Sequence, residues 1–218
     1  MKFIYFSLII GFLFSCKKEG TNSDIVVSFP QTLYGTKITN KTDVRLFTNR
    51  KEIFDKAVIG NFIKNSTIFN LQENSPTDSD SIRFITQDTA VFGSSSTKLH
   101  VIKTGEQFLF YSPLTPIPVT SDTSESFFKY TAPKITLSNG GLYTNYIYVA
   151  YGDYAILDVS LLSYKLKYSG HPYTGTSTPG GETWGTMPNE FNENYVTITD
   201  TYNDTLAIQE FKITCKAK

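Results

Sequence analysis

Short segments with the hydrophobic pattern of β-strands follow one another along this chain. Four of them come in close succession, at residues 82–86, 89–92, 97–103 and 107–111, and the third alternates, with Leu99 and Val101 on one face. Turn residues such as Thr104 and Gly105 separate them. This spacing predicts an antiparallel meander.

Segment 154–168 contains the clearest strand. Its apolar residues, such as Leu157 and Val159, first occupy odd positions, and from Leu162 onward they occupy even positions. A change of face of this kind predicts an extra residue, and therefore a bulge or bend near Leu161 and Leu162. Long bent strands are typical of curled sheets and barrels.

Weaker signals divide the remainder of the chain. Short apolar runs predict strands at 25–29, 44–47, 126–135, 195–200 and 206–215, and turns are expected over 35–43 and at 139–141. Segment 169–188 is rich in glycine and proline, which predicts an irregular loop.

One helix is expected near residues 50–64. Phe54, Val58 and Phe62 recur at four-residue spacing, which predicts an apolar stripe on a helix packed against a sheet. Asn49 with Glu52 three residues later matches a capping box at its start.

These elements predict a mainly β fold in one domain, residues 25–218, with the meander closed as a barrel or stacked as a β-sandwich. The strand spacing over 82–213 resembles that of the lipocalin-like barrels found among bacterial lipoproteins, although the Gly-x-Trp usual in that family is missing. The resemblance implies a barrel whose interior binds a small apolar ligand.

The N-terminus is typical of export. Lys2 precedes an apolar span, 3–14, which is shorter than the roughly 20 residues that cross a bilayer, so residues 1–15 are expected to be a signal peptide. Leu13-Phe14-Ser15-Cys16 resembles the looser lipobox of Bacteroidota-type lipoproteins. The resemblance implies a lipid on Cys16, a flexible tether at 16–24, and attachment to the cell envelope at the outer membrane, on its periplasmic or its surface face.

Charge and cysteine content exclude several partners and sites. The 20 basic and 20 acidic residues balance without a basic cluster, so no nucleic-acid partner is expected. There are two cysteines and two histidines, and with Cys16 acylated too few remain for a disulfide or a Cys/His zinc site. No catalytic motif is present, so neither a cofactor nor an enzymatic activity is expected.

Candidate ligand-binding residues gather in segment 169–188. Trp184 is the only tryptophan, and Tyr173 and His171 are near it in sequence. Aromatic side chains on a loop can stack on sugars, whereas His171 lacks the nucleophile that a general base needs. The expectation is therefore a non-catalytic binding or structural lipoprotein. Its ligand would be a small apolar molecule in a barrel, or a glycan on the Trp184 loop, and a third alternative is a subunit of an envelope complex.

Overall fold

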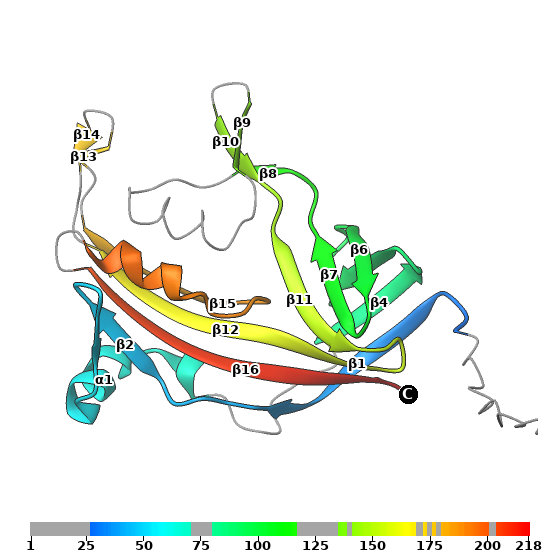
Figure 1. The fold of residues 1–218 in the computed structure, drawn as a ribbon, viewed down its shortest axis with the longest axis horizontal. Coiled ribbons are helices and arrows are strands. Elements are labelled where there is room, and N and C mark those ends of the chain that lie inside the picture. The colour runs from blue at the N-terminus through cyan, green and yellow to red at the C-terminus, as the bar shows by residue number, and fades with distance from the viewer. Residues whose placement is uncertain are drawn as a thin grey trace, which may run out of the picture.

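The strands of the computed structural model close into a barrel (Figure 1). The model describes residues 27–70, 80–116, 135–138, 141–168, 172–173, 176–177, 180–200 and 204–218. Within these ranges the barrel has eight antiparallel strands: β1 (Gln31–Thr39), β4 (Ser81–Thr86), β5 (Thr89–Phe92), β6 (Leu99–Thr104), β7 (Gln107–Tyr111), β11 (Ile147–Gly152), β12 (Ile156–Tyr168) and β16 (Thr205–Ala217). It closes because β12 pairs with β11 on one edge and with β16 on the other. The predicted mainly β fold is confirmed, and the meander forms a barrel rather than a sandwich.

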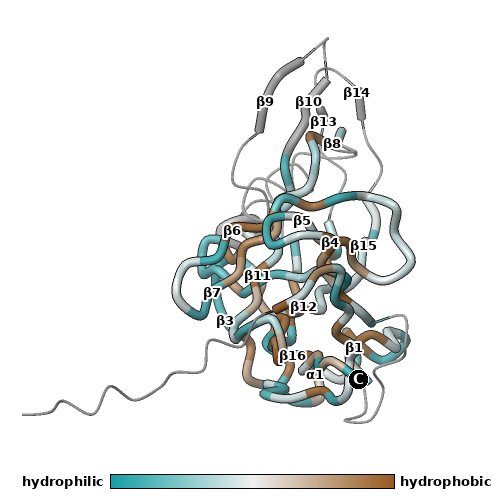
Figure 2. Tube along the Cα trace, turned by 90° about the vertical axis from the view of Figure 1, so that its right-hand side faces the viewer, coloured by the Kyte–Doolittle hydropathy of each residue, from teal (hydrophilic) through white to brown (hydrophobic). Residues whose placement is uncertain are grey.

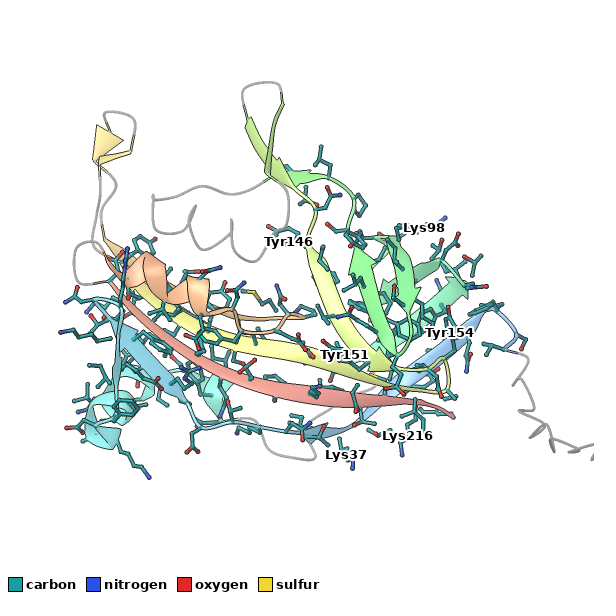
Figure 3. All side chains as sticks on the ribbon, in the orientation of Figure 1. Lys37, Lys98, Tyr146, Tyr151, Tyr154 and Lys216 are labelled. Carbon is teal, nitrogen blue, oxygen red and sulfur yellow. The ribbon has the colours of Figure 1, made fainter. Side chains whose placement is uncertain are left out.

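Aromatic rings fill the barrel interior. Phe84, Phe108 and Phe110 are fully buried. The Phe84 ring centroid lies 5.0 Å from that of Tyr154, which Figure 3 labels, and 5.9 Å from that of Phe108. Burying one such side chain contributes about 1.5–3 kcal/mol to the stability of the fold. In Figure 2 hydrophobic stretches accordingly run through the middle of the body, around β12 and β16.

Two strands continue beyond the barrel. β12 and β16 are 13 residues long, and their far halves pair with each other in an extension of the same 11-stranded sheet, called the second sheet below. In this sheet β15 (Gly181–Met187) lies beside β12, while β2 (Arg45–Thr48) and β3 (Lys51–Ile53) lie beyond β16.

Opposite faces of the second sheet carry separate apolar clusters. Leu206 and Ile208 pack with residues of the 3₁₀ helix η2 (Glu193–Asp200), whereas Ala207 packs with α1 (Lys56–Ile63) and the 3₁₀ helix η1 (Thr67–Phe69). Neighbouring strand residues point to opposite faces, so the sheet lies between two layers. Figure 1 shows α1 in cyan below the sheet and η2 in orange above it.

Of the two alternatives predicted near Leu161 and Leu162, a bulge or a bend, the bulge is wrong. The register of β12 with β16 is uninterrupted from Ile156 opposite Lys216 to Lys167 opposite Thr205. The apolar residues change face because different parts of the protein cover the two halves of β12. Up to Leu161 the apolar odd-numbered residues pack into the barrel interior. From Leu162 onward the apolar even-numbered residues lie on the opposite face, where they pack with a residue of η2 and with residues that flank η2.

The helix is confirmed, but its predicted cap is wrong. Asn49 and Arg50 have φ of 47° and 59°, respectively, and form the tight turn between β2 and β3, where Thr48 pairs with Lys51. Positive φ at both central residues is what such hairpin turns require, and asparagine tolerates it. Asp55 caps α1 instead, because its carboxylate accepts hydrogen bonds from the Ala57 and Val58 amides at 2.8 and 3.2 Å.

Three other strand and loop predictions need correction. Residues 35–39, expected to be turn-rich, belong to β1, which tolerates a bulge between Gly35 and Lys37. Segment 195–200 is the 3₁₀ helix η2 rather than a strand. Segment 169–188 contains the regular strand β15. The strand expected at 25–29 lies partly outside the described residues, and β1 begins only at Gln31.

The remaining strands form two small sheets. The first contains β8 (Thr115–Pro116), β9 (Ile135–Ser138) and β10 (Gly141–Thr144), and the second contains β13 (Pro172–Tyr173) and β14 (Thr176–Ser177). Ser138 pairs with Gly141, as the predicted turn at 139–141 requires. The strand predicted at 126–135 lies almost entirely outside the described residues. Across the described ranges, every helix is too short or too polar to span a bilayer.

Candidate functional site

The structure places the predicted site residues in different settings. Cys16 and His171 lie outside the described residues, and Tyr173 belongs to β13, where only the backbone is described. Trp184 is described in full, and 59% of its surface is exposed. The site is therefore built outward from Trp184.

Trp184 lies on a strand, not on the predicted loop. In β15 it pairs with Lys165 of β12, while Gly181 and Gly185 pair with Tyr168 and Tyr164. The glycine content of segment 169–188 predicted an irregular loop, but these two glycines make room for aromatic rings. A Cβ on Gly181 would come within 2.9 Å of the Tyr168 hydroxyl oxygen. Glycine in a strand often marks such a close approach.

A groove runs between α1 and the β12–β15 edge of the second sheet. Its volume is about 560 Å³, and it combines an exposed indole, an aliphatic and an aromatic wall, amides and charged groups. Its lining residues are Val58, Asn61, Phe62, Asn65, Ser66, Lys165, Lys167, Glu182 and Trp184. The volume lies within the range of about 300–1,000 Å³ typical of small-molecule sites.

Lys165 is the most deeply placed charged residue of this groove, with 7% of its surface exposed. Its Nζ donates a 2.9 Å hydrogen bond to the Phe62 carbonyl oxygen, near the C-terminus of α1. The same atom lies 3.2 Å from a Glu182 carboxylate oxygen and 4.9 Å from the Phe62 ring centroid. A buried ammonium is tolerated only with such partners. Lys165 therefore holds α1 against the sheet and forms the floor of the groove.

The groove has the chemistry of a binding site. An exposed indole offers a flat apolar face to a sugar ring, and amides and ammonium groups donate hydrogen bonds to hydroxyls or carboxylates. The described ranges contain no cluster of three His, Cys, Asp or Glu side chains arranged to hold a metal ion. The groove therefore offers stacking and polar contacts.

The barrel interior offers a much smaller space. A cavity of about 140 Å³ lies between Ile82, Phe92, Val159 and Cys215, among other residues. That is below the volume of ordinary ligand sites. Burial, with smaller contributions from Asp80 and Asp158, raises the pKa of the Cys215 thiol to about 12. Cys215 is thus a protonated core residue at neutral pH.

Sequence reasoning identified Trp184 but missed its neighbours in the groove. Lys165 and Glu182 lie on two strands, Asn61 lies in the last turn of α1, and Asn65 follows two residues after the end of the helix. The predicted helix gave no sign that these two asparagines line a groove. The pairing of β12 with β15 left no signal in the sequence, because the glycine and proline content of segment 169–188 predicts a loop.

Comparison with known proteins gives no relative for this chain. No protein-family model, no curated protein and no solved structure matches it.

Proposed function

We propose that this protein is a lipid-anchored, non-catalytic lipoprotein of the cell envelope that binds a glycan in the groove between α1 and the β12–β15 edge. One observation carries the proposal. Trp184, with 59% of its surface exposed, stands at the rim of a 560 Å³ groove whose floor holds a nearly buried lysine. An exposed indole beside a hollow of this volume offers a flat apolar face on which a ligand can stack.

The groove offers both kinds of contact that a sugar uses. The indole would stack on the apolar face of a pyranose ring. The amides of Asn61 and Asn65 and the Ser66 hydroxyl line the opposite wall, where they can exchange hydrogen bonds with ring hydroxyls. Several polar side chains surround the single exposed indole of Trp184, and this arrangement favours a glycan over a purely apolar ligand.

The small interior cavity argues for placing the ligand outside the barrel. Phe84 and its aromatic neighbours pack inside the barrel, and the pocket beside this core measures only about 140 Å³. A lipid on Cys16, joined through the 16–24 tether, would hold the domain at the outer membrane, and each buried methylene of that lipid contributes about 0.8 kcal/mol.

A glycan array probed with the full chain in detergent tests the binding proposal. The wild-type protein is expected to bind at least one glycan, and Trp184→Ala is expected to abolish that signal while leaving the melting temperature unchanged. Absence of binding across the array, or undiminished binding by Trp184→Ala, would overturn it. Metabolic labelling with a clickable palmitate tests the anchor, since Cys16→Ala should lose the label.

A further inference from the structure

We infer that the α1 groove selects a negatively charged glycan, one whose sugars carry carboxylate or sulfate groups. This inference rests on the proposed function and specifies its ligand class. It follows from the charges that line the groove and from how they are already paired.

The charged lining of the groove is predominantly positive. The five α1-side residues are uncharged, and the sheet contributes Lys165, Lys167 and Glu182. The single carboxylate is already engaged, because the Glu182 side chain lies 3.2 Å from the Lys165 ammonium. The groove therefore has an excess of one positive charge at neutral pH.

Lys167 supplies this unpaired charge. It is exposed on β12, two positions beyond Lys165, and its ammonium takes part in none of the hydrogen bonds or ion pairs found among the described residues. In the sheet register it lies opposite Glu182, while Lys165 lies opposite Trp184. All four side chains consequently share one face of the sheet.

The register brings Lys167 within reach of a sugar stacked on Trp184. Diagonal neighbours on one face of an antiparallel pair lie about 7–8 Å apart, a distance that a lysine side chain can span. An acidic group on the stacked ring, or on the next ring of the chain, would then receive a charge-assisted hydrogen bond from Lys167. Neutral sugars would make the stacking contact without this bond.

Isothermal titration calorimetry with the full chain tests the inference with matched probes. The acidic probe is trigalacturonate, the neutral probe is its methyl ester, and a sulfated galactan oligosaccharide distinguishes sulfate from carboxylate recognition. We expect at least one anionic probe to bind about tenfold more tightly than the methyl ester, because a hydrogen bond to a charged partner is gained. Lys167→Gln should remove that advantage, and added salt should weaken anionic binding only.

Lys98→Gln is the matched control, because Lys98 is also exposed but lies at the opposite end of the molecule from α1 (Figure 3). It should bind every probe as the wild type does. Equal affinity for the methyl ester and both anionic probes, or an anionic preference that survives Lys167→Gln, would overturn the inference and leave the glycan-binding proposal standing. Loss of all binding on the array would instead overturn the proposed function.

Discussion

Lys165 and Trp184 lie directly opposite each other on β12 and β15, yet 7% of one and 59% of the other is exposed. The difference comes from α1, which covers the lysine and leaves the indole at the rim. Lys165 donates to the Phe62 carbonyl oxygen at 2.9 Å, so the helix is fixed to the sheet beside the indole. The hydrogen bond that fixes the helix and the proposed binding surface at Trp184 therefore lie at the same pair of strand residues.

Removing the Lys165 ammonium should loosen α1. Lys165→Met keeps the aliphatic stem but leaves the Phe62 carbonyl without its donor, and we expect a loss of about 1–3 kcal/mol in the free energy of unfolding. Urea denaturation measures it. The exposed Lys167→Met is the control and should change stability by no more than about 0.5 kcal/mol. Equal effects of the two variants would contradict the role assigned to Lys165.

The aromatic cluster should dominate barrel stability. Phe84 is fully buried, whereas 80% of Phe54 is exposed. Phe84→Ala leaves a cavity and should cost about 3–5 kcal/mol, while Phe54→Ala should stay within about 0.5 kcal/mol. Thermal unfolding of the two variants gives the comparison, and a small effect at Phe84 would show that the barrel does not depend on this cluster.

Stability should fall at alkaline pH because of Cys215. Its thiol pKa is about 12 in the folded protein, raised mainly by burial from an ordinary value of 9.0. A raised folded pKa means that this contribution is present in full well below pH 9 and is lost as the pH rises toward 12. At pH 9.5 the loss is about 0.8 kcal/mol.

Urea unfolding between pH 7.5 and 9.5 measures this loss. Desolvation raises the pKa values of the partly buried Tyr148 and Tyr164, which moves their titration away from that interval. Cys215→Ala should be less stable at pH 7.5 but should show a flatter pH dependence. An unchanged slope would mean that the thiol does not carry the effect.

Two glycines should respond in opposite directions to alanine. Gly152 has φ of +135°, and an added Cβ would collide with the Ile156 carbonyl oxygen, so Gly152→Ala should destabilise the barrel. Gly60 lies within α1 with open space around its Cβ position, so Gly60→Ala should stabilise the protein by about 0.5–1 kcal/mol. Chemical denaturation of both variants checks the two signs, and destabilisation by Gly60→Ala would contradict the open environment.

Local patterns predicted the strands best where one side of the sheet faces the same environment throughout. The strands predicted at 89–92 and 107–111 coincide with β5 and β7, and in β7 fully buried residues alternate with less buried ones. The prediction was wrong at Leu162, where the apolar cluster that covers β12 moves to the other face of the sheet. It was also wrong in β15, where glycines make room for aromatic rings and do not form turns. Neither situation can be recognised from the neighbouring residues in the sequence.

The candidate site was predictable only in its aromatic member. Trp184 stood out as the single tryptophan, but its position on a strand beside Lys165 follows from pairing between distant segments. Asn49 and Asp55 show the same limit on a smaller scale. Both are good helix-capping residues, and the hairpin between β2 and β3 decided which of them caps α1.

The sequence by itself determined the β-rich character, most strand positions and the presence of one helix, because these follow from periodicity over a few neighbouring residues. Only the tertiary structure decided that the strands close into a barrel, which faces the helices cover, and that a groove forms at Trp184. The bond between Lys165 and Phe62 joins residues 103 positions apart. No local sequence pattern predicts such a contact, because it depends on how distant segments of the chain pair and pack.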